Sequence, residues 1–250
     1  MPSQSLDKQT VMVTGAAGSL GAAIARGLRK SGCRVLALDR DAAGLDALAK
    51  DGIATIACDL LDENAAARCI GEAWQHHGPI SVLVNAVGLI HSAPLINIAA
   101  TSGRKHSLAA WRRVIDLNLT AAFVATVNTV DRMVSTRTRG VVINFSSLAA
   151  SGNAGQGAYA AAKAGVNAMT TSWAKELGIR GIRFVAIAPG FIDVPSTRAA
   201  LAESVLNDWV QRTPLHRLGS VEDVISTIVF AIETEYINGK VIEIDGGLTL

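Results

Sequence analysis

Short, continuously apolar segments alternate along the chain with longer, alanine-rich amphipathic segments. Strands that are apolar at every position belong to a sheet covered on both faces, and a helix between two such strands forms a right-handed crossover between parallel neighbours. We therefore predict an α/β fold, a doubly wound parallel sheet flanked by helices, as a single domain over residues 1–250. The predicted strands are residues 10–13, 34–38, 53–57, 80–84, 141–145, 182–187 and 241–244. The predicted helices are residues 20–30, 42–49, 64–76, 108–134, 158–176, 197–211 and 221–232.

Composition narrows the classes of function. Half of the residues are hydrophobic, which is enough to build a large core, and 23 basic against 21 acidic residues give a net charge of only +2. Since no run of one charge is long, we expect no nucleic-acid partner. No stretch approaches the roughly 18 apolar residues of a membrane span, and the first residues lack the pattern of a signal peptide, so we expect no membrane partner.

The cysteines indicate the compartment. Cys33, Cys58 and Cys69 are odd in number and lack the paired spacing of a zinc site. This usage argues against a disulfide framework and is typical of a reducing compartment. We therefore predict no metal site and a cytoplasmic location.

Residues 89–107 interrupt the alternation of strands and helices. The segment is polar, contains Pro94 and Gly103, and includes the basic triplet Arg104-Lys105-His106. Such a segment forms either a variable surface loop or a contact with substrate or with another subunit. Both interpretations stay open.

A glycine-rich turn joins the first predicted strand to the first predicted helix. Gly15, Gly18 and Gly21 allow a tight turn and a close approach of the backbone to a ligand, and Ser19 and Leu20 begin the helix. A helix amino terminus offers free N–H groups to a pyrophosphate, so the pattern predicts a Rossmann-type dinucleotide site. The alternative is a packing turn without a ligand.

Asp39 ends the second predicted strand, 18 residues after Gly21. At this spacing a carboxylate bonds the adenosine ribose hydroxyls and repels a 2′-phosphate, so NAD is preferred. The neighbouring Arg40 would pair with that phosphate, which keeps NADP possible. The alternative for Asp39 is a cap for the next helix.

Tyr159 and Lys163 stand four residues apart on a predicted helix and therefore share one face. A free tyrosine has a pKa of about 10 and is a poor base at neutral pH. An ammonium group nearby favours the phenolate and lowers the pKa, so the hydroxyl could exchange a proton with an alcohol or carbonyl oxygen.

With these motifs together, the chain resembles the single-domain subclass of the short-chain dehydrogenase/reductase family, over nearly its whole length. Segments 153–159 and 213–219 are most similar to bacterial β-ketoacyl-acyl carrier protein reductases and related ketoreductases. The motifs that carry the resemblance are Thr14-Gly15 with Gly21, Cys58-Asp59-Leu60, residues 84–88, Asp116 with Asn118, Phe145-Ser146-Ser147, Tyr159 with Lys163, residues 189–192, and Asp245-Gly246-Gly247.

The resemblance implies the roles of the catalytic residues. Tyr159 matches the family's general acid/base, and Lys163 matches the residue that bonds the nicotinamide ribose and lowers the tyrosine pKa. Asn118 matches the residue that holds a water linking the lysine to solvent. A serine at the end of the fifth strand matches the group that holds the substrate oxygen. The strand register favours Ser147, whereas the family's usual distance from the tyrosine favours Ser146.

The resemblance also implies further cofactor contacts. They are Asp59 and Leu60 at the adenine, Asn85, Ala86 and Gly88 beside the cofactor, and Pro189, Gly190 and Ile192 at the nicotinamide. Two positions depart from the family pattern. Ser19 replaces a glycine of the turn, and Val194 replaces a threonine near the carboxamide, where one hydrogen bond would be lost or supplied by another group.

Together these features predict an oxidoreductase that transfers a hydride between a nicotinamide cofactor and a secondary alcohol or ketone. One alternative is an NADPH-dependent 3-oxoacyl thioester reductase. Another is a non-catalytic NAD(H)-binding regulatory or scaffold protein on the same fold. We expect a small-molecule alcohol or ketone as substrate. The resemblance implies a homotetramer or homodimer, with the small-residue face of residues 160–168 as the subunit contact. The alternative for that face is burial inside the monomer.

Overall fold

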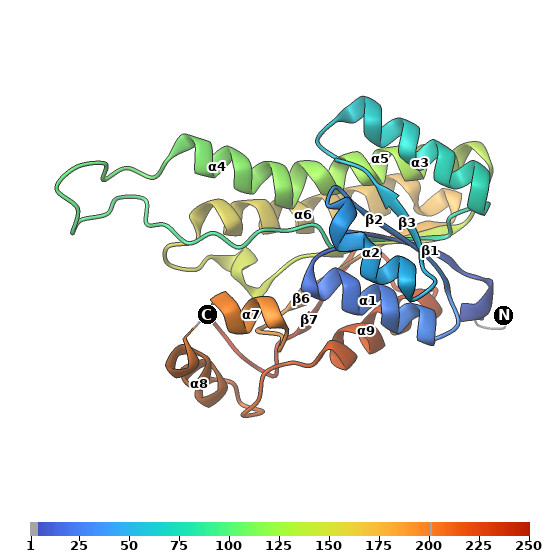
Figure 1. The fold of residues 1–250 in the computed structure, drawn as a ribbon. Helices are drawn as coiled ribbons and strands as arrows, with labels where there is room; N and C mark the ends of the chain where they lie inside the picture. The colour runs from blue at the N-terminus through green and yellow to red at the C-terminus, as the bar shows by residue number, and fades with distance from the viewer. Residues whose placement is uncertain (1–4, 201) are drawn as a thin grey trace.

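A computed structural model describes residues 5–200 and 202–250, and its core is a parallel β-sheet in the order β3-β2-β1-β4-β5-β6-β7 (Figure 1). Every neighbouring pair of strands is parallel. The order reverses between β1 and β4, as in a doubly wound sheet, so the predicted fold class is confirmed. The strands are β1 (Thr10–Thr14), β2 (Arg34–Asp39), β3 (Ala54–Ala57), β4 (Val82–Asn85), β5 (Gly140–Phe145), β6 (Ile182–Pro189) and β7 (Lys240–Ile244).

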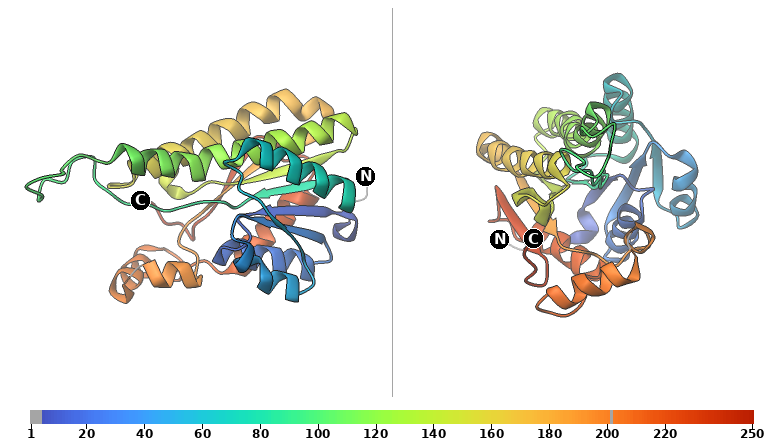
Figure 2. Two further views of the ribbon diagram at one scale, coloured as in Figure 1. Left: turned by 45° about the horizontal axis from the view of Figure 1, so that its top comes forward. Right: turned by 90° about the vertical axis from the view of Figure 1, so that its left-hand side faces the viewer.

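Helices cover both faces of this sheet (Figures 1 and 2). On one face lie α1 (Ser19–Lys30), α2 (Ala42–Lys50) and α9 (Val221–Glu233). On the other lie α3 (Glu63–His77), α4 (Leu108–Ile115), α5 (Ala121–Ser135) and α6 (Gly157–Leu177). Two shorter helices, α7 (Pro195–Ala200) and α8 (Glu203–Arg212), follow β6 at the carboxyl edge of the sheet. Within the described ranges no helix has the length and apolarity needed to cross a membrane.

Strand β1 shows why its apolar run is continuous. Val11 and Val13 point into the core beneath α1 and α9, whereas Met12 points into the core beneath α3 and α5. All three are fully buried. Because successive side chains of a strand face opposite sides, a sheet with two covered faces needs apolar residues at every position.

Two predicted helices differ from the structure. The predicted helix 108–134 is interrupted by a π-turn at Asp116–Thr120, in which the Ala121 N–H donates to the Asp116 carbonyl. The chain stays helical on both sides of this wider turn, so the sequence pattern predicts one long helix. The predicted helix 197–211 corresponds to two helices, α7 and α8, and Ala202 directly before α8 has an extended backbone.

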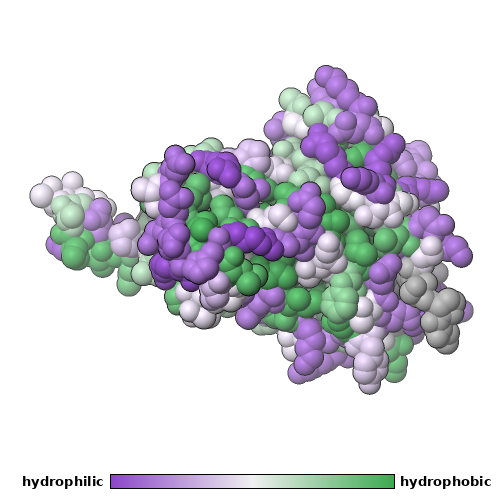
Figure 3. Space-filling view, turned by 90° about the horizontal axis from the view of Figure 1, so that it is seen from below, coloured by the Kyte–Doolittle hydropathy of each residue, from purple (hydrophilic) through white to green (hydrophobic). Residues whose placement is uncertain are grey.

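The segment between β4 and α4 forms a hairpin that stands clear of the body (Figures 1 and 3). We call residues 90–106 the arm. Its two sides are joined by a bridge between Ile96 and Lys105, and the Asn97 N–H donates to the Arg104 carbonyl at 2.7 Å. Ser107 then caps α4 by accepting from the Ala110 N–H. The predicted surface excursion is therefore a hairpin whose two sides are joined by backbone hydrogen bonds.

Candidate active site

The glycine-rich turn lies at the carboxyl edge of the sheet, where its geometry excludes side chains. Gly15 has a φ of +68°, and a Cβ there would lie 2.8 Å from the Val87 nitrogen. A Cβ on Gly21 would lie 2.1 Å from the Gly15 carbonyl oxygen. Gly18 precedes α1 without a side-chain cap, so the first N–H groups of the helix stay available to an anion.

These observations fit a bound dinucleotide. A turn without Cβ atoms lets a pyrophosphate approach the backbone, and the exposed helix start at Ser19 and Leu20 supplies donors and a partial positive charge. Gly88 adds a further close approach, because a Cβ there would meet Asn118 Oδ1 at 3.0 Å and Lys163 Nζ at 3.7 Å. The chain is thus shaped for a ligand along this edge.

Asp39 ends β2 beside the turn. Its two carboxylate oxygens accept from the Ala17 N–H and the Asp41 N–H, each at 3.0 Å. The cap of α2 is Asp41, which accepts from the Gly44 N–H. Asp39 therefore does not cap the next helix, and its carboxylate is held against the glycine-rich turn. Arg40 beside it is exposed.

The Asp59 segment is fastened to the end of β2. The Cys58 N–H donates to the Asp39 carbonyl at 2.8 Å, and Asp59 Oδ1 accepts from the Leu61 N–H. Leu60 is buried in the core beneath α3. The structure thus brings the two acidic residues that were predicted to contact the adenosine to one end of the edge.

Tyr159 and Lys163 lie on the first turns of α6 and are both buried, with 8% and 3% of their surface exposed. Lys163 Nζ lies 5.6 Å from the centroid of the Tyr159 ring and donates to the Phe145 carbonyl at 2.7 Å. The Tyr159 hydroxyl hydrogen-bonds the Ser147 side chain. The pair shares one helix face, as the four-residue spacing predicted.

The structure distinguishes the two candidate serines. Ser147 Oγ accepts from the Ala149 N–H at 3.2 Å and lies beside the Tyr159 hydroxyl. Ser146 is buried, and its Oγ instead faces the Lys163 carbonyl at 3.4 Å. Both serines follow the end of β5, and of the two only Ser147 bonds the phenol.

The pKa of Tyr159 differs from the expectation. We expected Lys163 to lower the pKa of Tyr159, but burial raises the pKa of Tyr159 in this structure, and only the Ser147 hydrogen bond opposes it. Burial also lowers the pKa of Lys163 to about 8. Both shifts have one physical cause: water is excluded from this site, so the charged form of each group is disfavoured.

Asn118 lies in the π-turn between α4 and α5. Its Nδ2 donates to the Leu89 and Val114 carbonyls, both at 2.9 Å, and its Oδ1 accepts from the Leu89 N–H. The side chain is therefore used to fix the strand-to-arm connection. π-Turns often occur at functional sites, and this one brings Asn118 close to Gly88 and Lys163.

Comparisons with known proteins decide the family. A family model described as "Enoyl-(Acyl carrier protein) reductase" matches residues 15–249. The 3-oxoacyl-[acyl-carrier-protein] reductase FabG of Thermotoga maritima is 35% identical over 254 residues, covering 98% of this chain and 99% of that protein. The (3R)-3-hydroxyacyl-CoA dehydrogenase of Canis lupus familiaris is 34% identical, covering 95% of each chain. The chain belongs to the short-chain dehydrogenase/reductase family. It is an oxidoreductase that binds a nicotinamide cofactor and acts on CH–OH groups.

One buried network of this short-chain dehydrogenase was missed by sequence reasoning. Asn85 Nδ2 donates to Asn144 Oδ1 and to Thr126 Oγ1, and Asn144 Nδ2 donates to Thr170 Oγ1, each at 2.9 Å. The Asn85 side chain thus ties β4 to β5 and α5 inside the core. Only the backbone of the following residues, including Ala86, lies against Gly15. Asn144, a polar residue in an otherwise apolar predicted strand, is the sequence feature that could have indicated this network.

The segment after β6 forms the other wall of the short-chain dehydrogenase site. Pro189 ends the strand, and a Cβ on Gly190 would lie 3.0 Å from the Asp245 Cα, so the segment packs tightly there. Ile192 is buried. Phe191 stacks on Trp209 of α8, with ring centroids 4.5 Å apart.

The helices α7 and α8, which we call the lid helices, make few other side-chain contacts with the body of the protein. Leu206 is the only buried residue of α8, and Arg212 lies 4.3 Å from the Trp209 ring. Asp193 pairs with Arg198 at 2.6 Å and 2.7 Å where the chain enters α7. Val194 is buried in the core and supplies no hydroxyl to this wall.

Proposed function

We propose that this short-chain dehydrogenase interconverts a secondary alcohol and a ketone with NAD(H), and that Tyr159 is its general acid/base. The observation that carries the proposal is the convergence of Tyr159, Ser147 and Lys163 in one water-excluded site beside the glycine-rich turn. A proton donor, a second donor for the substrate oxygen and a buried cation are the groups that carbonyl reduction needs.

Each residue has a stated task. The Ser147 hydroxyl holds the substrate oxygen within reach of the phenol, and the Tyr159 hydroxyl transfers the proton to that oxygen. Lys163, anchored on the Phe145 carbonyl, holds the nicotinamide ribose. Asn118 is a positioning residue that fixes Leu89 behind Gly88. The bound nicotinamide supplies the hydride.

Burial raises the pKa of Tyr159, so the phenol keeps its proton at neutral pH. The protonated phenol is the form that donates to the new alkoxide when a ketone is reduced.

Asp39 supports NAD as the cofactor. Its carboxylate is held at the end of β2 by two backbone N–H groups, where it would accept from ribose hydroxyls and repel a 2′-phosphate. Together with the turn it forms the adenosine end, to which Asp59 and Leu60 contribute. The test is Asp39→Ala, for which kcat/KM with NADPH rises relative to NADH. An unchanged ratio would show that Asp39 does not select the cofactor.

A second candidate is an NADPH-dependent 3-oxoacyl thioester reductase. The observation that favours it is the similarity over nearly the full length to proteins named 3-oxoacyl-[acyl-carrier-protein] reductase. Exposed Arg40 beside Asp39 would then pair with the 2′-phosphate. Turnover of a 3-oxoacyl thioester with NADPH exceeding that with NADH would favour this candidate over the first.

We further propose a homodimer or homotetramer. Trp111, Phe123, Val127 and Val134 are large apolar side chains exposed on the outer face of α4 and α5. We call these four residues the helix stripe. Beside it, α6 presents exposed Ala161, Ala164 and Ala168, which let another helix approach closely. Such a surface is typical of a subunit interface.

We place the protein in the cytoplasm, supported by its cysteines. Cys33, Cys58 and Cys69 are all free thiols. Burial, together with a hydrogen bond to Cys69, raises the pKa of the Cys58 thiol to about 12. Unpaired thiols are typical of reducing compartments.

Replacement of Tyr159 by Phe tests the proposed reaction. In a panel of ketones and secondary alcohols, Tyr159→Phe should lower kcat by about a hundredfold or more because the proton donor is lost, while NADH affinity stays unchanged. Ser147→Ala should also lower kcat, whereas Ser146→Ala, one residue away, should not. Full activity of Tyr159→Phe would contradict the proposal.

A further inference from the structure

Two of the three cysteines lie in contact beside the proposed adenosine end. Cys58 directly follows β3 and is buried, with 5% of its surface exposed. Cys69 lies on α3 and is partly exposed, and its side chain hydrogen-bonds that of Cys58. Its Sγ also donates to the Ala57 carbonyl at 3.9 Å. Two thiols in contact, one of them open to solvent, are the arrangement from which a disulfide forms.

Cys58 is linked directly to the residues that we propose to hold the adenosine, so this inference rests on the proposed function. The Cys58 N–H donates to the Asp39 carbonyl at 2.8 Å, and Asp59 is the next residue. The residues between Cys58 and Cys69 form the connection from β3 to α3. A shift of Cys58 towards α3 therefore moves Asp59 and loosens the bond to the end of β2.

The two thiols differ in their access to solvent, which assigns them different steps. Cys69 is partly exposed, so it is the thiol that a small hydroperoxide reaches. Burial, together with the Cys69 hydrogen bond and the charges of Asp59 and Asp62, raises the pKa of Cys58 to about 12. Cys58 therefore stays a thiol until its neighbour has reacted. A thiol beside an oxidised cysteine is the group that closes a disulfide.

We propose that a hydroperoxide converts Cys58 and Cys69 to a disulfide, and that this bond weakens binding of the dinucleotide. The Cys69 sulfur takes one oxygen of hydrogen peroxide as a sulfenic acid, and the thiol proton leaves with the other oxygen as water. The Cys58 sulfur then attacks the Cys69 sulfur, and its proton leaves with the displaced hydroxide as a second water. A thiol such as glutathione reverses the reaction by exchange and is itself oxidised.

Bond formation changes the distance between the two sulfurs. The sulfurs of a disulfide are roughly 2 Å apart, closer than two hydrogen-bonded thiols, so the end of β3 and α3 move towards each other. This shift opposes the hydrogen bond between the Cys58 N–H and the Asp39 carbonyl. Loss of about one hydrogen bond corresponds to a roughly tenfold lower affinity for NADH.

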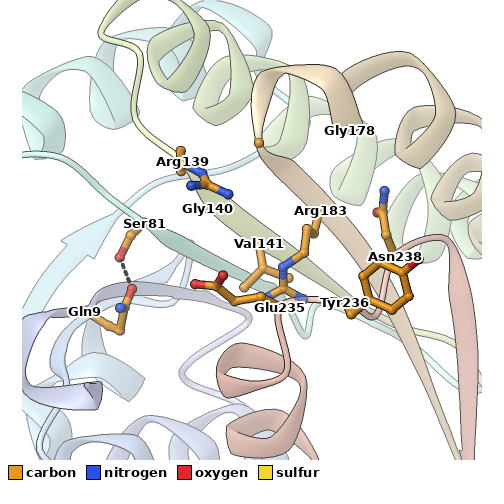
Figure 4. Close-up of a pocket in the computed structure, with 11 residues that line it drawn as sticks. Gln9, Ser81, Arg139, Gly140, Val141, Gly178, Arg183, Glu235, Tyr236 and Asn238 are labelled. Atoms are coloured by element: carbon orange, nitrogen blue, oxygen red, sulfur yellow. Dashed lines mark hydrogen bonds between the residues drawn. The ribbon is translucent and has the colours of Figure 1, made fainter. Parts of the chain in front are cut away.

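Cys33 offers a matched control. It directly precedes β2 and so lies at the amino edge of the sheet, the edge that also carries a pocket lined by Ser81 and Arg183 (Figure 4). Cys33 packs into the core on the opposite face of the sheet from Cys58. Burial alone raises the pKa of Cys33 to about 11. Cys33 therefore shares the burial of Cys58 but lies apart from Cys69.

Peptide mapping of the full chain tests the bond. After brief treatment with hydrogen peroxide and alkylation of the remaining thiols, trypsin should release residues 51–68 joined by a disulfide to residues 69–104. The joined peptide should disappear with dithiothreitol and in Cys69→Ala, and it should persist in Cys33→Ala. Conversion of Cys69 to a sulfinic acid without the joined peptide, or a disulfide to Cys33, would overturn the proposal.

Fluorescence titration with NADH tests the coupling to the cofactor. The Kd of the oxidised wild type should be roughly tenfold above that of the reduced protein, and dithiothreitol should restore it. Cys69→Ala should give the same Kd before and after peroxide treatment, because it forms no disulfide, whereas Cys33→Ala should respond as the wild type does. A mapped disulfide that leaves the Kd unchanged would overturn the proposal.

Reciprocity gives a further readout that needs no turnover. If the disulfide weakens NADH binding tenfold, saturating NADH favours the two thiols over the disulfide by the same factor. The reduction potential of the pair, measured in graded glutathione buffers, should therefore rise by about 30 mV when NADH is present. An unchanged potential would contradict the coupling.

The outcomes separate this proposal from the proposed function. A protein that reduces ketones with NADH but never yields the joined peptide would refute the disulfide and leave the reaction standing. A protein that yields the joined peptide and the shift in Kd, yet keeps full activity as Tyr159→Phe, would refute the role of Tyr159 and support the disulfide.

Discussion

The floor and the walls of the site are built differently, although both lie at the carboxyl edge of one sheet. The floor consists of the glycine-rich turn and the Tyr159–Lys163 pair, and it is fixed by backbone contacts and burial. The walls are the segment after β6 and the helices α7 and α8, which are largely exposed. Trp209 on Phe191 is one of the few side-chain contacts that hold α8 in place.

From this difference we infer which region determines the reaction and which determines substrate specificity. A change in the floor disturbs the core, because the contacts that we propose to position the cofactor also pack the sheet. A change in the walls alters only surface contacts, so the walls can adapt to a substrate without loss of the fold. We therefore expect floor variants to affect stability and turnover, and wall variants to affect substrate affinity.

The largest effect is expected from Gly21→Ala. A Cβ there would lie 2.1 Å from the Gly15 carbonyl oxygen, and backbone cannot move aside cheaply. The free energy of unfolding should fall by about 3 kcal/mol, the upper range for overpacking, and NADH binding should weaken with it. Chemical denaturation measures the first and fluorescence titration the second. Gly157→Ala is the control, since a Cβ at Gly157 meets nothing within 4 Å; equal losses in both variants would contradict the account.

Lys163→Met tests the floor through the pH dependence of the free energy of unfolding. The pKa of Lys163 falls from 10.5 to about 8 on folding, so between these values the unfolded chain binds more protons and stability rises with pH. Relative to Lys163→Met, the wild type should therefore gain about 3 kcal/mol between pH 7 and pH 10.5. Urea denaturation across this range measures the difference. A difference in the free energy of unfolding that stays constant across this pH range would mean that burial does not disfavour the ammonium form of Lys163.

Trp209→Ala changes a wall residue, and we expect it to have the smallest effect of the three substitutions. Loss of the stack on Phe191 should raise KM for the ketone about fivefold, in line with the modest energy of one aromatic pair, with kcat nearly unchanged. Steady-state kinetics with NADH in excess measures both constants. Trp209→Phe keeps a ring and should restore KM. A fall in kcat with unchanged KM would contradict this expectation, because Trp209 would then affect turnover instead of substrate affinity.

The residues of the floor could be predicted from the sequence, because short intervals between residues determine how they lie relative to one another. The glycines between β1 and α1, Asp39 at the end of β2, and the four-residue interval from Tyr159 to Lys163 depend only on local geometry. The family resemblance rests on these same motifs.

The remaining features depend on contacts that local spacing does not record. The hairpin of the arm is made by bonds between residues distant in sequence, such as Asn97 to Arg104. The amide network through Asn85 and Asn144 joins separate strands and helices. The raised pKa of Tyr159 reflects its burial in the folded chain, so it could not be read from the neighbouring lysine.

The proposed reaction requires a Tyr159 phenol that stays protonated until a ketone oxygen takes its proton. The chain has two tyrosines, so ¹³C labelling at the tyrosine ζ carbon gives two signals, which Tyr159→Phe assigns. In the ligand-free protein the Tyr159 signal should shift only at a higher pH than that of N-acetyl-tyrosinamide. A Tyr159 signal that shifts near neutral pH would contradict the account, because the site would then hold a phenolate base instead of a proton donor.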